Sequence, residues 1–323
     1  MTSYSKEWYK CLEKQIDTDL EMYKHIKIDH KDIAKLKKSS KHICIVIKKN
    51  VIKTDIPKTS WNVTERRYSS LFELMQLSIN YAIDHKLPSI TGKFYFRIAD
   101  GYDFEFNYPT INYSKPKNKL GFLVPDFNFL DVFTKIDTFK RECSKTDKIN
   151  KLYFKGGSNS VKKSKIREKM SKFKTPFKVL INTKSDPYYY LCKYKYVLDL
   201  PGFKPWSVRL IELYMSTSLP VRILLYNSKW DEDIWVQFYE NMFPPSISYA
   251  NISIDTDYDK EMPVSILKEI ETKCLQVYKF FNNHTKAYNK IVQDNFEKVN
   301  ALQETHIGYY MYHLLMSYNK VLK

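Results

Sequence analysis

Short β-rich runs alternate with amphipathic helical stretches along most of this chain. Residues 42–47 (HICIVI) form a β-rich run, whereas residues 71–83 repeat apolar side chains at helical spacing. Because parallel strands need a covering crossover between them, the alternation favours parallel sheets with helices on their faces. The 323 residues are enough for two such units of about 150 residues. We therefore expect an α/β protein of two Rossmann-like domains that face a cleft.

The local pattern also predicts where each element lies. Ser70 and Glu73 have the spacing of a capping box, which predicts that a helix begins at Ser70. The polar segment 143–151 (CSKTDKINK) is the expected linker, with one domain over residues 1–148 and the next from residue 149. Expected strands cover residues 42–47, 94–98, 120–124, 152–155, 177–181, 195–200, 219–226 and 252–254. Further expected helices cover residues 8–25, 131–143, 206–215, 233–241, 263–299 and 307–322, with a basic helix from about residue 164.

Composition excludes several classes of protein. Hydrophobic residues make up 43% of the chain, too many for a disordered protein. No stretch approaches the roughly 18 apolar residues of a membrane span, and residues 1–14 lack the profile of a secretory signal. The cysteines are widely spread and none has metal-ligand spacing, so we expect buried thiols and a cytoplasmic protein. They are Cys11, Cys44, Cys143, Cys192 and Cys274.

The charge balance favours anionic partners. Lysine and arginine number 53 against 36 acidic residues, a net charge of +17. Such a surface attracts polyanions and phosphorylated ligands, although coding bias explains an excess of lysine equally well. Tyrosines and lysines alternate over residues 188–196, which fits either a base-stacking platform or an edge strand with mixed faces. A basic nucleic-acid-binding protein is therefore one alternative for the function.

Ligands of open α/β sheets bind beyond the carboxyl ends of strands, and the segment 155–160 (KGGSNS) follows an expected strand. The glycines let backbone N–H groups approach a phosphate, and the following helix N-terminus adds positive field. The alternative is a plain turn, since neither a dinucleotide fingerprint nor a P-loop pattern is present. The residues that would form this anion site are Gly156, Gly157, Ser158, Lys162, Lys163 and Arg167.

Two more segments lie at expected strand ends. In residues 200–209 (LPGFKPWSVR), Ser207 and Arg209 fall in the first turn of an expected helix. An arginine there is electrostatically unfavourable unless an anionic ligand or a nearby carboxylate offsets it. Asp100 follows the expected strand 94–98 and precedes Gly101, so it is either a general base or a turn residue. Asp103, Glu105 and Asp126 are rival carboxylates, and no histidine array predicts a metal site.

These segments resemble glycosyltransferase family 90, which includes protein O-glucosyltransferases and capsule-associated xylosyltransferases. The most specific match is residues 192–221, which is similar to the K-Y-K-Y strand, W-S-x-R helix and S-L-V strand of the family. Residues 152–160 resemble the FRGS motif, with Lys155 in place of the arginine and Gly157 in place of the serine. Weaker matches are residues 95–103, 122–129 and 236–252, and together the segments span about residues 93–320.

The resemblance implies a GT-B fold in which residues 149–304 bind the nucleotide sugar and the helix 305–323 crosses back to residues 1–148. It implies inverting transfer from UDP-xylose or UDP-glucose to a glycan or glycopeptide, with xylose favoured, no obligatory metal and no specific nucleic acid. Asp100 becomes the catalytic base. A catalytically inactive interaction module with the same fold is a further alternative. The implied donor-binding residues are Gly156, Gly157, Ser158, Lys163, Arg167, Lys204, Pro205, Trp206, Ser207 and Arg209.

Overall fold

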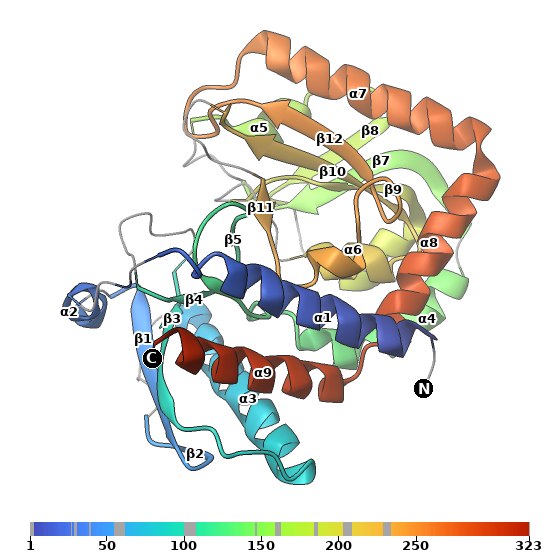
Figure 1. Cartoon of the computed structure of the whole chain (residues 1–323). Coiled ribbons are helices and arrows are strands. Elements are labelled where there is room, and N and C mark those ends of the chain that lie inside the picture. The colour runs from blue at the N-terminus through green and yellow to red at the C-terminus, as the bar shows by residue number, and fades with distance from the viewer. Residues whose placement is uncertain are drawn as a thin grey trace. The chain divides into compact units, whose positions relative to one another are not determined.

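A computed structural model describes most of the chain and divides it into two compact units (Figure 1). Unit 1 comprises Met1–Phe133, Val236–Met242 and Leu302–Lys323, and unit 2 comprises Thr134–Trp235 and Phe243–Ala301. The described residues are 3–26, 28, 31–38, 40–54, 62–99, 108–145, 147–158, 163–183, 187–202, 209–228 and 234–322. Among the helices of these segments, none is both long enough and apolar enough to cross a membrane.

Unit 2 contains a five-stranded, wholly parallel sheet. The strands are β7 (Ile149–Gly156), β8 (Phe177–Ile181), β9 (Tyr194–Asp199), β10 (Leu219–Tyr226) and β12 (Ala250–Asp255). Their order in the sheet is β8-β7-β9-β10-β12, which is 2-1-3-4-5 in chain order. This is a doubly wound order, and its direction reverses between β7 and β9. The expected parallel sheet is confirmed for this unit.

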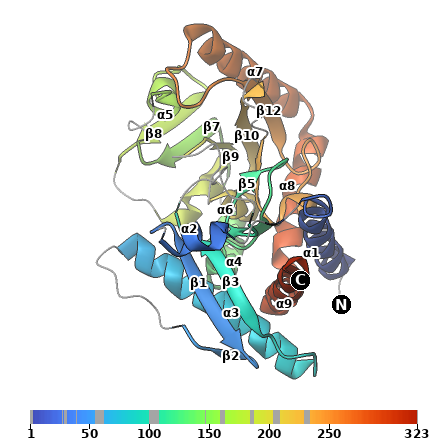
Figure 2. The same ribbon diagram turned by 60° about the vertical axis from the view of Figure 1, so that its left-hand side comes forward.

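Helices cover the sheet of unit 2. The chain enters through α4 (Asp131–Ser144), and α5 (Ile166–Met170), the 3-10 helix η1 (Tyr188–Lys193) and α6 (Leu210–Met215) connect the strands. The helices α7 (Val264–Asn283) and α8 (Thr285–Asn300) follow β12 and pack against β10, and α7 also packs against β12 (Figures 1 and 2). The expected helix 263–299 is thus broken at His284. The core of the unit includes Leu152, Phe154, Leu198, Val221, Ile252, Ile270 and Cys274.

Unit 1 contains a mixed sheet of order β2-β1-β3-β4-β6. The strand β1 runs antiparallel to both neighbours, whereas β3, β4 and β6 are parallel. The expectation of a parallel sheet is wrong here. Lys49 and Asn50 take φ values of 47 and 63 and close a tight hairpin between β1 and β2, and β1 also pairs antiparallel with β3. The strands are β1 (His42–Lys48), β2 (Val51–Ile52), β3 (Gly92–Arg97), β4 (Ile111–Asn112) and β6 (Phe122–Leu123).

The helices of unit 1 pack around the last helix of the chain. The helix α9 (Glu304–Val321) contacts α1 (Ser3–Glu21), α3 (Asn62–Asp84) and β3, while α2 (Asp32–Lys38) lies against β1 (Figures 1 and 2). Gly308 permits the close approach of α9 to α3, since a Cβ there would lie 2.9 Å from the carbonyl oxygen of Leu77. The C-terminal helix is therefore part of unit 1.

Two expected elements are wrong in detail. The helix predicted to begin at Ser70 begins at Asn62, and Ser70 is buried within it. Tertiary contacts support the extra turns, since Arg67 donates to the carbonyl oxygen of Ile98 at 2.5 Å. The helix expected over residues 233–241 is wrong, since the described residues there form the strand β11 (Trp235–Val236) and the 3-10 helix η3 (Glu240–Met242). Between these two elements, Phe238 packs edge-on against Phe129 of the same unit. A further short strand is β5 (Lys115–Pro116).

The expectation of five free thiols is also wrong. Cys143 of α4 and Cys192 of η1 form a disulfide, although they are 49 residues apart in sequence. Their Cα atoms lie 4.9 Å apart, within the range that a disulfide requires. Cys11, Cys44 and Cys274 take no part in a disulfide among the described residues. Since disulfides persist mainly in oxidising compartments, the cysteines no longer support a cytoplasmic location.

Candidate functional site

The candidate site lies at the switch point of the unit 2 sheet, where β7 and β9 end side by side. The chain leaves β7 through Gly157 and leaves β9 through Leu200. Arg167, near the start of α5, links the ends of these two strands. Its guanidinium donates to the carbonyl oxygen of Gly157 at 3.0 Å and to that of Leu200 at 3.1 Å. Ligands of doubly wound sheets bind in this position, beyond the carboxyl ends of the strands.

A second guanidinium reaches the same position. Arg209 stands at the N-cap of α6, and its Nη1 donates to the carbonyl oxygen of Lys155. The Cζ atom of Arg209 lies 4.7 Å from the centre of the Phe154 ring, and that of Arg167 lies 5.1 Å from it. Gly156 lies close to this group, because a Cβ on it would be 2.8 Å from Phe154 Cζ and 3.5 Å from Arg209 Nη1. The fold thus brings together residues that are more than 50 positions apart.

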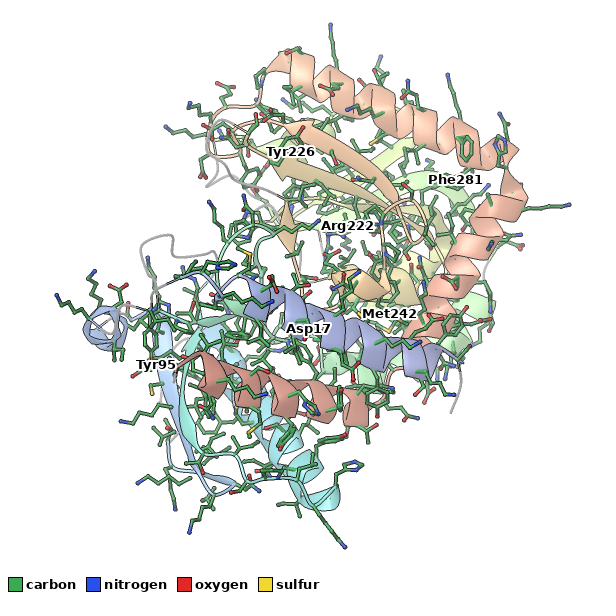
Figure 3. All side chains as sticks on the ribbon, in the orientation of Figure 1. Asp17, Tyr95, Arg222, Tyr226, Met242 and Phe281 are labelled. Atoms are coloured by element: carbon green, nitrogen blue, oxygen red, sulfur yellow. A yellow bond between two sulfur atoms is a disulfide. The ribbon has the colours of Figure 1, made fainter. Side chains whose placement is uncertain are left out.

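The electrostatics of the site favour an anion. Burial, and secondarily the charge of Arg209, lower the pKa of Arg167 to about 10. Burial also lowers the pKa of Arg209. Asp199 opposes both shifts, but its Oδ2 atom also accepts a hydrogen bond of 3.1 Å from Arg222 of β10, which is labelled in Figure 3. The Glu168 carboxylate also opposes the shift of Arg167, and that of Glu212 opposes the shift of Arg209. Burial of two guanidiniums at one place still favours a bound phosphate, whose oxygens would pair with them.

Several buried polar atoms at this switch point have no hydrogen-bond partner in the described part of the chain. They are Ser164 Oγ, Arg167 Nε, Glu168 Oε2 and Asp199 Oδ1. Folded proteins leave few buried polar atoms without partners, and each such atom costs free energy. These four atoms, in residues near the ends of β7 and β9, leave hydrogen-bonding capacity that a polar ligand or ordered water could take up.

The loop after β7 is held by residues that the sequence analysis missed. The backbone N–H of Ser158 donates to Asn182 Oδ1 at 2.8 Å, and the backbone N–H of Asn182 donates to the carbonyl oxygen of Gly156 at 3.1 Å. The hydroxyl of Ser158 donates to Glu168. Asn182 has φ 53, a left-handed conformation that asparagine tolerates. Its position directly after the expected strand 177–181 is the sequence signal that could have identified it.

The other expected site residues fall elsewhere. Lys163 is exposed, whereas Arg167 donates to the carbonyl oxygen of Gly157. Asp100, Lys204, Pro205, Trp206 and Ser207 lie outside the described residues.

The tyrosine and lysine alternation does not form an edge strand. Residues Tyr188–Lys193 form η1, and β9 lies in the middle of the sheet between β7 and β10. Tyr194 and Tyr196 are fully buried. These two rings therefore cannot offer the exposed base-stacking platform that the alternation suggested.

A buried serine–histidine pair in unit 1 is structural. The Nε2 atom of His306 lies 2.9 Å from Ser5 Oγ, a distance typical of a nucleophile and its base. However, His306 Nδ1 accepts a hydrogen bond from the backbone N–H of Gln303 at 3.0 Å. The proton of the neutral ring is therefore on Nε2, which donates toward Ser5 and cannot accept its proton. The pair anchors the start of α9.

In the part of the chain that the structure describes, no group of three or more histidine, cysteine or acidic side chains could hold a metal ion. No model of a known protein family matches the chain. No curated protein is significantly similar to it in sequence. The functional interpretation therefore depends on the geometry of the switch point and on the motifs found in the sequence.

Proposed function

We propose that the chain is an inverting glycosyltransferase that moves a sugar from a UDP-sugar to a hydroxyl of a glycan or glycopeptide. The observation that carries the proposal is the pair of guanidiniums, Arg167 and Arg209, at the switch point of a 2-1-3-4-5 parallel sheet. Guanidinium groups suit the oxygens of a phosphate, which they bind in a bidentate manner. The resemblance of residues 192–221 to glycosyltransferase family 90 supplies the choice of a UDP-sugar, with xylose favoured over glucose.

In this proposal the diphosphate binds beyond β7 and β9. The Arg209 and Arg167 guanidiniums and the Gly157 loop stabilise the negative charge that develops on the leaving UDP, so no divalent metal is required. Preorganised donors of this kind are each worth roughly 3–4 kcal/mol of activation free energy. Lys163 adds long-range positive charge, and Lys204, Pro205, Trp206 and Ser207 line the diphosphate and the ribose. Gly156 and Ser158 shape the loop.

Asp100 is the proposed catalytic base. Its carboxylate takes the proton of the acceptor hydroxyl as that oxygen attacks C1 of the sugar. The new C1–O bond forms on the face opposite UDP while the bond from C1 to the diphosphate oxygen breaks, so the configuration inverts. The electron pair of the broken bond leaves with UDP. The GT-B arrangement, with the acceptor held by residues 1–148 and the helix 305–323, is part of this proposal.

The first test measures UDP binding by titration calorimetry and sugar transfer by UDP release from UDP-xylose and UDP-glucose. We expect Arg209→Ala to weaken UDP binding at least tenfold. Arg141→Ala is the matched control, since Arg141 is an exposed arginine of the same unit and should leave binding unchanged. Unchanged UDP affinity in Arg209→Ala would refute the phosphate role.

The second test concerns the base. Asp100→Asn should keep UDP affinity and lose transfer, because the amide cannot accept the proton. Full transfer by this variant would refute the assignment. UDP binding without transfer from any donor would instead identify an inactive module. Tight, steeply salt-dependent binding of random RNA in the absence of UDP binding would favour the nucleic-acid alternative.

A further inference from the structure

A cavity of about 480 Å³ opens in unit 2 next to the switch point. Its lining includes Gly156, Gly157 and Arg209, the residues assigned above to the diphosphate, and also Lys155 and Glu212. Two tyrosines of η1, Tyr188 and Tyr190, line it as well. The volume lies within the range of small-molecule pockets, roughly 300–1,000 Å³. A molecule with an anionic end and a flat apolar end would match these two groups of lining residues.

Tyr188 and Tyr190 form an aromatic wall of the cavity, and neighbouring groups hold it in place. Lys193 Nζ lies 4.2 Å from the centre of the Tyr190 ring, and Lys135 Nζ lies 5.1 Å from that of Tyr188. Such cation–π contacts fix the orientation of a ring. The Cys143–Cys192 disulfide ties η1 to α4. The wall is therefore preformed, which reduces the entropy lost when a ligand binds.

A third aromatic residue of the lining is also held by its neighbours. Tyr153, which lines the cavity, stacks on Tyr194 with ring centres 3.9 Å apart and an angle of 2° between the planes. Asn182 and Thr183, which follow β8, add amide and hydroxyl groups at the rim. Aromatic faces together with a few polar groups are what a nucleobase requires, because the ring stacks while its edge forms hydrogen bonds.

We infer that this cavity holds the nucleobase of the donor, with its flat ring against Tyr188 and Tyr190 of η1. The inference rests on the proposed function, since it takes the diphosphate to lie at Gly157 and Arg209. It adds a base-recognition site formed by the connection between β8 and β9. The specificity for a pyrimidine nucleotide then depends on η1 rather than on the arginines.

The test compares two ligands, UDP and pyrophosphate, by titration calorimetry of the full chain. Stacking of a base on an aromatic ring, measured by alanine substitution, corresponds to about 5- to 100-fold in affinity. We expect Tyr190→Ala and Tyr188→Ala to weaken UDP binding by such a factor and to leave pyrophosphate binding within about twofold. The Tyr188 side chain is 37% exposed, so the Tyr188→Ala variant should fold even if the Tyr190→Ala variant does not. Tyr190→Phe keeps the ring and should keep UDP affinity.

The chain offers a matched control. Tyr189 lies between the two rings in sequence but is absent from the cavity lining, so Tyr189→Ala should bind UDP like the wild type. If the Tyr188 and Tyr190 variants bind UDP normally, the base lies elsewhere and the inference is overturned while the proposed function stands. The same conclusion follows if these variants bind UDP normally but bind UDP-xylose and UDP-glucose more weakly. If the wild-type chain binds neither UDP nor pyrophosphate, both are overturned.

Discussion

Two neighbouring glycines at the end of β7 provide a sharp test of how the site is packed. An added Cβ at Gly156 would lie 2.8 Å from Phe154 Cζ and 3.1 Å from Phe154 Cε1, whereas one at Gly157 would have no atom within 4 Å. Optimal carbon–carbon contacts are about 3.5–4.0 Å, so Gly156→Ala forces the Phe154 ring to move by about 1 Å. Phe154 is only 1% exposed, which leaves it little space to do so. Gly156→Ala should therefore destabilise the protein.

Overpacking of this kind costs about 1–3 kcal/mol, which lowers the melting temperature by about 2–12 °C in a unit of this size. Because both arginines stack on the displaced ring, UDP affinity should fall as well. Gly157→Ala should change the melting temperature by no more than about 2 °C. The assay is thermal unfolding of the two variants side by side. Equal melting temperatures, or a greater loss in Gly157→Ala, would refute the packing around Phe154.

Three further predictions concern other parts of the fold. Cys143→Ser should lower the free energy of unfolding by about 2–4 kcal/mol, because it opens the loop that the disulfide closes between residues 49 positions apart. His42, whose pKa is lowered to about 4 from 6.5 mainly by burial, binds fewer protons in the folded state, so stability should fall by up to about 3 kcal/mol as pH drops from 6.5 to 4. Lys115→Met should cost about 3–5 kcal/mol, because it removes the cation that pairs with the buried Asp19 carboxylate. Denaturant unfolding measures all three.

Each of these has its own control. A reductant should destabilise the wild type and have no further effect on Cys143→Ser; a wild type insensitive to reductant would contradict the disulfide. His42→Gln should flatten the loss of stability at acidic pH, whereas replacement of the exposed His85 should not; equal pH profiles would contradict the burial of His42. Lys140→Met removes an exposed ion pair and should cost less than about 1 kcal/mol. An equal cost for Lys115→Met would show that its pair is solvated.

The strands of unit 2 could be predicted from sequence because central parallel strands are apolar on both faces. The run Leu219–Tyr226 is buried at nearly every position, so its composition alone identifies it. The order of the strands could not be predicted, because it depends on packing between segments far apart in the chain. The antiparallel hairpin of β1 was missed because its turn residues, Lys49 and Asn50, carry no glycine.

The residues of the candidate site were likewise predicted only in part. Gly156 and Arg209 were identified because each lies where an expected strand gives way to a helix. Asp199 is the last residue of β9 and Asn182 directly follows β8, but single Asp and Asn residues at strand ends are common in turns. Only the 2-1-3-4-5 order shows which strand ends meet at the switch point. The sequence pattern therefore suggests several strand ends, and the topology selects among them.

The central claim is that a nucleoside diphosphate binds at the switch point of unit 2. A crystal structure of the full chain with UDP tests it most directly. The proposal predicts the diphosphate within hydrogen-bond distance of the Arg167 and Arg209 guanidiniums and next to the Gly157 loop. Density for UDP at any other place, with the hydrogen bonds of Arg209 to Lys155 and of Arg167 to Gly157 unchanged, would contradict it.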